Sequence, residues 1–259
     1  MRIGAAEAYD GMKRDPERWL YTLLDLADPL RREGLFFYRT AGGLAVICDY
    51  DEETAVRLYG ADRELMEEAA SDPAVGEGTR FCFCAGLPDG ELPDHAGGHR
   101  LTLREGVPTL ERYGLFGSPR ETVRADPPAG FSVRELREGD RASFPETDAW
   151  RRLEDGLVSR APGDRIWLAL DGGTGIPCGY LWCAEAGRAW TDIVNLFVSP
   201  EARRRGIGRA LVSRYASEAR IRGRRPYYGY ALSRGSAALA RSMGFGEIHG
   251  KTVSLYAAD

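Results

Sequence analysis

Apolar residues in the first half of the chain are spaced first as in an amphipathic helix and then as in strands. Leucines recur every three or four positions after Pro16, whereas short continuous apolar runs flank Gly42-Gly43. The pattern predicts, in order, a helix over residues 16–32, hairpin strands over 35–38 and 44–47, a helix over 52–70 and a strand over 79–85. The first half is therefore expected to form a mixed α/β layer.

The second half has a longer and more regular pattern. It predicts a strand over residues 131–136, a helix over 141–160, strands over 165–170, 178–183 and 190–198, a helix over 206–222, a strand over 226–231, a helix over 235–243 and further β structure over 247–257. The three consecutive strands, with a turn at Gly187 before the last of them, favour an antiparallel meander.

A segment without either spacing separates the two halves. Residues 125–130 combine two prolines and a glycine between patterned segments, which is typical of a turn or linker. We therefore expect two domains, over residues 1–126 and 130–259.

Composition narrows the classes of protein. The N-terminus has no apolar segment of the kind found in signal peptides, and the longest apolar runs are far shorter than the roughly 20 residues that span a bilayer. Five cysteines without a dense framework favour reduced thiols. The net charge of -4 and pI near 5.6 argue against nucleic acid as the main partner. A cytoplasmic protein that binds neither membrane nor nucleic acid is expected.

One stretch departs from this acidic balance. Nine arginines between Arg203 and Arg225 face a single acid, Glu218. Such a stretch either binds an anion or forms the solvated face of a helix, and the charge pattern alone leaves both interpretations open.

Two glycines at the start of this stretch favour an anion site. Gly206 and Gly208 stand where the predicted strand gives way to a helix, so backbone amides and the positive end of the helix dipole can face a phosphate. A Walker A loop would need a following Gly-Lys-Ser/Thr, which is absent. A dinucleotide fingerprint would need a third glycine at Leu211 and a preceding βαβ unit.

The segment resembles the Arg/Gln-x-x-Gly-x-Gly/Ala signature of GNAT acyltransferases, with Arg203, Gly206 and Gly208 in the defining places. Residues 195–200 and 236–245 are similar to the family's fourth strand and to its last helix, which ends in Gly-Phe. The resemblance implies an α/β fold with a mixed, mostly antiparallel central sheet flanked by helices. More weakly, the N-terminal half resembles the degenerate GNAT-like domains of two-domain members, which implies a similar architecture there.

The resemblance also implies where the cofactor, acetyl-CoA, would bind. It would lie in a V between the strands at 190–198 and 226–231, with its pantetheine on backbone groups of Phe197 and Val198 and its pyrophosphate on the amides of residues 204–209. The cofactor-binding candidates are Phe197, Val198, Arg203, Arg204, Arg205, Gly206, Ile207, Gly208, Arg209, Ser233 and Ser236.

Catalysis requires a neutral amine, a polarised carbonyl and a stabilised thiolate. A backbone N–H at a bulge near Phe197 or Val198 would polarise the carbonyl. Asp192 is a candidate base or an edge residue, and Asn195 a candidate substrate ligand or a partner of buried backbone. The family's usual acid, a tyrosine, is replaced by Ala240, and its asparagine by Ser233. The substitute acids that we consider are Tyr227, Tyr228 and Tyr230 of the neighbouring strand, of which Tyr230 is preferred.

Two cysteines and two histidines in the first half could suggest a zinc site. Cys82 and Cys84 precede His95 and His99, which are ligand types for zinc. One residue between the cysteines is fewer than the two to four of structural zinc sites, so we expect reduced core thiols and no metal.

Two functions are compatible with these observations. The first is an N-acetyltransferase that moves an acetyl or other short acyl group from acyl-CoA to an amine by direct attack on the thioester. The alternative is a non-catalytic acyl-CoA-binding or regulatory module, which the replaced tyrosine and asparagine favour. The acceptor would be the amine of a small molecule or peptide, and the chain a monomer or homodimer.

Overall fold

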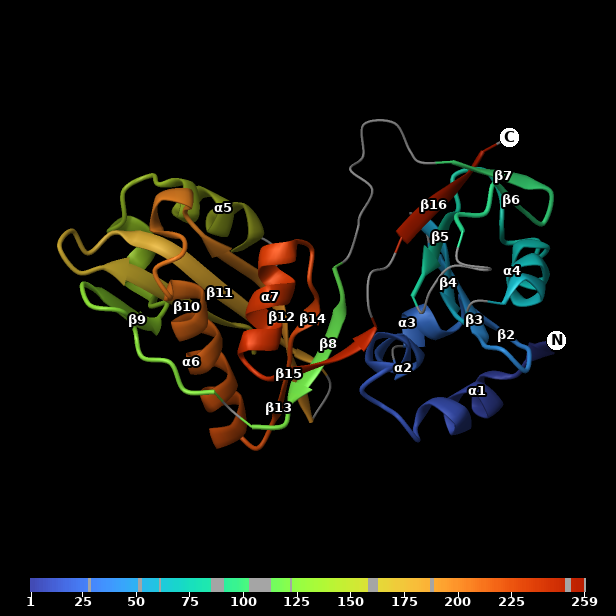
Figure 1. The fold of residues 1–259 in the computed structure, drawn as a ribbon, viewed down its shortest axis with the longest axis horizontal. Coiled ribbons are helices and arrows are strands. Elements are labelled where there is room, and N and C mark those ends of the chain that lie inside the picture. Colours follow the sequence, from blue (N-terminus) through green and yellow to red (C-terminus); the bar gives the residue numbers. More distant parts are fainter. Residues whose placement is uncertain are drawn as a thin grey trace. The chain divides into compact units, whose positions relative to one another are not determined.

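The computed structural model describes residues 1–27, 29–50, 53–60, 62–84, 91–102, 113–121, 123–157, 163–186, 189–249 and 253–258. The chain forms two compact units (Figure 1). The first comprises Met1–Leu115, Tyr230–Ala237 and Glu247–Asp259, and the second Phe116–Gly229 and Ala238–Gly246. Sequence analysis expected the contiguous ranges 1–126 and 130–259, whereas the second unit begins at Phe116 and two segments near the end of the chain, Tyr230–Ala237 and Glu247–Asp259, belong to the first unit.

The first unit contains an eight-stranded sheet in the order β1-β2-β3-β4-β5-β16-β7-β6. Its elements are β1 (Arg2–Ile3), α1 (Ala5–Met12), α2 (Leu20–Ala27), α3 (Pro29–Arg32), β2 (Leu35–Arg39), β3 (Leu44–Tyr50), β4 (Glu53–Tyr59), α4 (Arg63–Ala70), β5 (Arg80–Phe83), β6 (His95–Ala96), β7 (His99–Thr102) and β16 (Val253–Ala258).

Helices cover both faces of this sheet. Leu65 and Met66 of α4 pack on one face, in a core that includes Val56 and Phe81. Met12 of α1 packs on the other face, in a separate core. Apolar residues of the central strands therefore point to both sides, and the unit has three layers.

The second unit contains a five-stranded sheet in the order β13-β12-β11-β10-β9. Its elements are β9 (Phe131–Glu135), a 3₁₀ helix (Glu138–Ala142), α5 (Asp148–Leu157), β10 (Arg165–Asp171), β11 (Pro177–Ala186), β12 (Trp190–Val198), a 3₁₀ helix (Pro200–Ala202), α6 (Ile207–Ile221) and β13 (Arg225–Tyr227). The predicted antiparallel meander is confirmed by the pairing of β10, β11 and β12. The turn expected at Gly187 lies outside the described residues.

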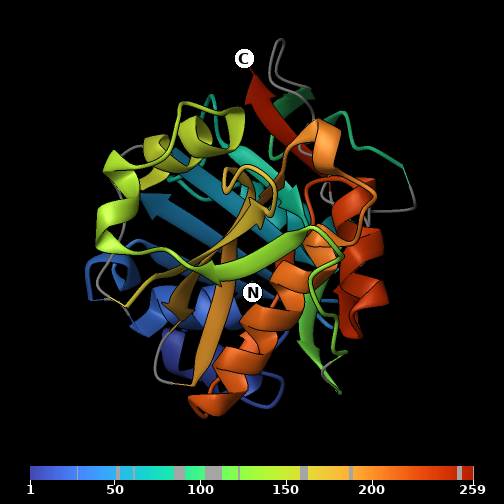
Figure 2. The same cartoon turned by 90° about the vertical axis from the view of Figure 1, so that its left-hand side faces the viewer.

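Two helices enclose this second sheet. Trp150 and Leu153 of α5 pack on one face against Ile166 and Tyr180. On the other face lies α6, drawn in orange in Figure 2, whose Tyr215 ring contacts the Trp167 ring with centroids 6.2 Å apart. Both faces of the sheet are again buried.

The remaining elements are β8 (Leu115–Pro119), β14 (Gly229–Tyr230), α7 (Arg234–Ser242) and β15 (Phe245–His249). The three strands form a small sheet in the order β14-β8-β15. β16, at the end of the chain, instead pairs with β5 and β7 of the first unit.

The two large sheets share one topology. In each, an edge strand is followed by helices, three antiparallel strands, a covering helix and a strand parallel to the third. Thus β4, α4 and β5 correspond to β12, α6 and β13, because both outer strands pair in parallel. The similar architecture expected for the N-terminal half is confirmed.

One predicted helix is wrong. Residues 52–70 were expected to form a single helix, but β4 occupies Glu53–Tyr59 and α4 only Arg63–Ala70. β4 lies between β3 and β5, and its consecutive residues Leu58 and Tyr59 point into different cores. A strand buried on both faces loses its polar alternation, so its pattern resembles a buried helix.

Two other helices differ in extent from the prediction. The helix expected over residues 16–32 begins at Leu20, and α5 covers only Asp148–Leu157 of the expected 141–160. α1 was not predicted. None of the helices that the structure describes combines the length and the apolar run that a bilayer-spanning segment requires.

Candidate functional site

The loop between β12 and α6 is held in a backbone conformation that glycine favours. Gly206 precedes the helix with φ of 91°, and no protein atom lies within 4 Å of the position that its Cβ would take. Arg204 also has a positive φ, of 63°, which is uncommon for a residue with a side chain. Left-handed residues in such a loop turn successive amides toward one side, which suits an anion.

The amides of this loop are unused. The first helical hydrogen bond runs from the Ala210 amide to the Gly206 carbonyl at 3.1 Å, and no side chain caps the helix. Within the described part of the chain, no acceptor takes a hydrogen bond from the amides of residues 204–209. Unused amides and the positive end of a helix dipole are groups of the kind that bind anions in proteins.

The arginines of the loop have different roles. The Arg203 Nε donates to the Val198 carbonyl at 2.9 Å, so this side chain ties the loop to the end of β12. The Arg205 guanidinium lies over the Phe131 ring, 5.5 Å from its centroid. Both side chains are exposed, as is Arg209. The loop thus offers positive charge from side chains that surround the free amides.

β12 has an open edge next to this loop. It pairs in parallel with β13 from Trp190 opposite Arg225 to Asp192 opposite Tyr227. β14, which follows β13 along the chain, belongs to a different sheet. The rest of β12 pairs with β11 alone among the described strands, so its other edge is open there.

Strand parity decides which backbone groups face the open edge. The Ser199 amide donates to the Cys178 carbonyl of β11 at 2.9 Å, and bonded and non-bonded positions alternate along an antiparallel pair. Phe197 is therefore bonded to β11, whereas Leu196 and Val198 point their amides and carbonyls to the open edge. The backbone groups that face the open edge near this point are therefore those of Leu196, which sequence analysis did not identify, and not those of Phe197.

The bulge in β12 lies earlier than expected. Ile193 is opposite Cys183 and Asn195 opposite Trp182, so Val194 is the extra residue. The expected position was near Phe197 or Val198. Val194 is 52% exposed, and a bulged residue is left out of the ladder.

A buried tyrosine holds the two strands where they separate. The Tyr215 hydroxyl of α6 lies 2.5 Å from the Thr191 carbonyl of β12 and 2.8 Å from the Tyr227 carbonyl of β13, and it accepts from the Tyr227 amide at 3.0 Å. Burial, and then the nearby charge of Asp192, raise the pKa of Tyr215 well above its usual value. The hydroxyl stays protonated and serves as a fixed bridge, which sequence analysis did not predict.

The predicted catalytic residues have different surroundings. Asp192 is half-buried on β12 at the last position paired with β13, whereas Asn195 is exposed. Tyr230 belongs to the first unit, where its ring stacks on Tyr21 with centroids 5.6 Å apart. The Asp192 carboxylate is therefore close enough for its charge to act on the buried Tyr215 hydroxyl.

Ser233, which precedes α7, and Ser236, in its first turn, lie at the N-terminus of this helix. The Ser233 hydroxyl accepts from the Ser236 amide at 3.1 Å, and the Ser233 carbonyl accepts from the Ala237 amide at 3.0 Å. Serine is a favoured N-cap residue, which explains how this helix begins without the family's asparagine. Ala240, at the place of the family's tyrosine, is fully buried.

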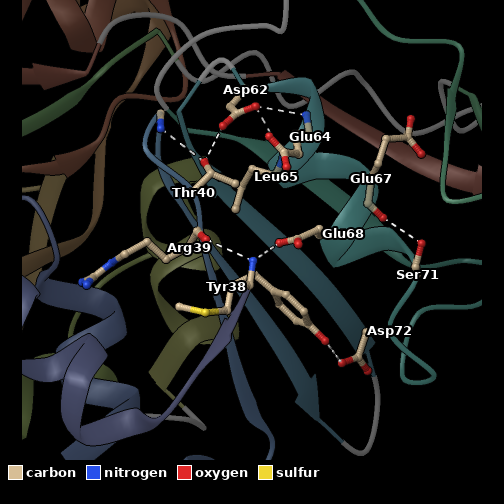
Figure 3. Close-up of polar contacts among 12 residues, drawn as sticks. Tyr38, Arg39, Thr40, Asp62, Glu64, Leu65, Glu67, Glu68, Ser71 and Asp72 are labelled. Carbon is tan, nitrogen blue, oxygen red and sulfur yellow. Dashed lines mark hydrogen bonds and ion pairs between the residues drawn. The ribbon is translucent and has the colours of Figure 1, made fainter.

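The counterpart helix in the first unit has no free N-terminus. The Asp62 carboxylate accepts from the amides of Glu64 and Leu65 at 3.0 and 3.5 Å, and it also binds the Thr40 hydroxyl (Figure 3). The Thr40 hydrogen bond, with the two amides, lowers the pKa of Asp62. At the N-terminus of α4 the amides are thus bound by a carboxylate of the chain itself, whereas the amides at the equivalent position of α6 are open.

The cysteines and histidines considered as zinc ligands lie in different surroundings. Cys82 and Cys84 are buried in the core that α1 covers, and the Cys84 Sγ donates to the Cys82 carbonyl. His95 is exposed beside Asp94. Among the described residues, no three side chains of ligand type gather as a metal site would require.

Residues 131–245 match the acetyltransferase (GNAT) family, and this part of the chain is a GNAT acetyltransferase domain. Members of the family are typically acyl-CoA N-acyltransferases and usually bind acetyl-CoA. None of the curated proteins compared with the chain matches it.

Solved structures resemble the whole chain. A GCN5-related N-acetyltransferase from Kribbella flavida has a TM-score of 0.53 and 13% identity, over 93% of this chain and 94% of that one. A GCN5-related N-acetyltransferase-like protein from Streptococcus suis 89/1591 has a TM-score of 0.48 and 15% identity, over 98% and 99%. A tandem GNAT protein from the clavulanic acid biosynthesis pathway has a TM-score of 0.48 and 16% identity, over 92% of this chain and 87% of that one. The first similarity shows that the chain has a GNAT-like fold.

Proposed function

We propose that the chain is an acyl-CoA-dependent N-acyltransferase that moves an acetyl or other short acyl group to an amine. The observation that carries the proposal is the run of unused amides at residues 204–209, which ends at the uncapped start of α6 beside the open edge of β12. A pyrophosphate needs this set of donors, and a linear amide-containing arm needs this kind of edge.

The residues present fit acetyl-CoA. The exposed Arg204, Arg205 and Arg209 surround the amides and add charge for the phosphates. The amides and carbonyls of Leu196 and Val198 face the open edge, where they suit the amides of pantetheine, although Arg203 already takes the Val198 carbonyl. The bound cofactor would supply an activated thioester.

The chain's own residues would then prepare the amine. Asp192 is the carboxylate closest in sequence to the Val194 bulge on β12, and we assign it the removal of the amine proton, directly or through water. The backbone at the bulge, left out of the ladder, is our candidate for polarising the carbonyl. Tyr230 remains the candidate proton donor to the departing thiolate, and Asn195 the candidate ligand of the amine.

One observation favours the alternative of a non-catalytic acyl-CoA-binding module. Ala240 stands at the place of the family's tyrosine and is fully buried, so this position offers no proton donor. A screen of amine acceptors that follows free-thiol release from acetyl-CoA separates the two functions. Binding without thiol release for every acceptor class would support the module.

The cofactor assignment has a matched pair of variants. Gly206→Val and Gly223→Val place a β-branched residue at positive φ, of 91° and 71°, at the two ends of α6, and neither Cβ meets protein atoms. Both should destabilise the chain similarly, because such backbone is strained for branched residues. We expect Gly206→Val alone to lose acetyl-CoA binding in calorimetric titration. Equal affinity in both variants would move the cofactor elsewhere.

A further inference from the structure

A second group of arginines lines a cavity of about 320 Å³ in the second unit. Arg120, Arg220, Arg224 and Arg225 line it together with Ser118 and two prolines. None of these lining residues is acidic. Four cations around one small space repel one another, so the arrangement favours an anion between them.

Most of these side chains are held in place by the protein. The Arg220 Nη2 donates to the Pro119 carbonyl at 2.7 Å, and the Arg224 Nη1 donates to the Trp190 carbonyl at 3.2 Å. The Arg225 guanidinium lies 5.4 Å from the centroid of the Trp190 ring. Fixed guanidinium groups lose less conformational freedom on binding a ligand than a freely solvated arginine face would.

The surroundings do not neutralise this charge. Glu185 is shared by two arginines, Arg222 at 3.3 Å and Arg224 at 2.5 Å. The C-terminal end of α6 contributes roughly half a negative charge. The guanidinium groups of Arg120 and Arg225 make no hydrogen bond or ion pair with other described residues.

The cavity is separate from the loop of the proposed cofactor site. Arg220 lies in the last turn of α6, whereas the loop precedes the first turn. Fifteen residues of helix separate the two ends by about 22 Å. An anion in this cavity would therefore be a different group from a pyrophosphate held at residues 204–209.

We propose that this cavity is a second anion site, which binds the phosphate groups of a small polyphosphorylated ligand. Guanidinium groups bind phosphate oxygens with two parallel hydrogen bonds, and several of them can share one phosphate chain. Ser118 and the prolines complete the lining. The site does not depend on the proposed transferase activity.

Calorimetric titration of inorganic tripolyphosphate into the full chain tests the proposal, at about 0.15 M salt where exposed charges are screened. The variant Arg120→Gln/Arg225→Gln removes two charges that make no ion pair with described residues. The matched control, Arg14→Gln/Arg32→Gln, removes two exposed arginines of the first unit. We expect about tenfold weaker binding, or loss of one binding event, in the first variant alone.

Any tripolyphosphate bound at residues 204–209 contributes equally in all three proteins, so their comparison isolates the cavity. Arg220→Gln provides a second, independent removal. Identical isotherms for the wild-type chain and Arg120→Gln/Arg225→Gln, or no binding to the wild-type chain, would overturn the proposal. A nucleoside triphosphate that binds the wild-type chain more tightly than tripolyphosphate, and loses this gain in Arg120→Gln/Arg225→Gln but not in the control, would support the proposal and identify the phosphates as those of a nucleotide.

Discussion

Removing the Tyr215 hydroxyl should weaken binding at the proposed cofactor site by more than the loss of stability explains. The hydroxyl is fully buried and accepts the Tyr227 amide of β13 while its own proton is shared with the Thr191 carbonyl of β12. Phenylalanine at this position leaves a backbone donor and a backbone acceptor without their partner. The two strands then lose the bridge at the point where the V opens.

The cost follows from these contacts. A buried backbone group left without a partner costs about 1–3 kcal/mol, so the loss of two such partners in Tyr215→Phe should lower the unfolding free energy by about 2–6 kcal/mol. For a chain of this size that lowers Tm by roughly 5–20 °C. If the bridge also sets the separation of the strands, acetyl-CoA affinity should fall about tenfold, which is about 1.4 kcal/mol.

Thermal unfolding and calorimetric titration with acetyl-CoA measure the two effects separately. Tyr59→Phe is the control, because it also removes a buried tyrosine hydroxyl, one that lies 3.3 Å from the Thr22 hydroxyl in the first unit. We expect both variants to unfold at a lower temperature than the wild-type chain and only Tyr215→Phe to bind acetyl-CoA more weakly. Unchanged affinity in a folded Tyr215→Phe protein would refute the bridging role and leave Tyr215 as a core residue.

Three further outcomes are expected. Asp192→Asn should lower kcat at least tenfold with little change in acetyl-CoA affinity, since a general base contributes that much or more; normal turnover across pH would make Asp192 structural. Asp140→Asn should destabilise the chain by about 1–3 kcal/mol near neutral pH, because the 2.7 Å hydrogen bond from Arg134 lowers the pKa of Asp140. Because the pKa of Asp140 is lower in the folded than in the unfolded chain, its carboxylate contributes stability above the unfolded pKa near 4, and this contribution is lost as the pH falls through the folded pKa. The unfolding free energies of the two proteins, measured in urea, should therefore converge in acid. Asp62→Ala should cost about 1 kcal/mol in thermal unfolding through loss of an N-cap and leave acetyl-CoA affinity unchanged.

The order of elements in the second half could be predicted because each has a clear period and a boundary. β12 was predicted with its observed ends, Trp190–Val198, and α6 within one residue at each end. Gly206 marks the turn before the helix, and its requirement for positive φ is local. Such features depend on neighbouring residues only, so the sequence alone contains them.

Pairing could not be predicted in the same way. The pattern indicated β structure near the end of the chain, but nothing local says that Ser254 pairs with Cys82, far away in the sequence. The direction in which the backbone groups of Phe197 and Leu196 point likewise depends on which residues of β12 hydrogen-bond to β11 and on the bulge at Val194. Periodicity reports which side chains are buried, and it leaves the choice of backbone partner open.

The two units show why shared topology does not imply a shared site. In both, a strand leads through a short loop into a helix that covers a parallel strand pair. Before α4 the loop ends in Asp62, whose carboxylate satisfies the helix amides and adds negative charge. Before α6 it ends in Gly206 after three arginines, which leaves the amides open and adds positive charge. A few residues at the helix start therefore make the N-terminus of α4 repel an anion and the N-terminus of α6 attract one, so we expect one cofactor site in each chain.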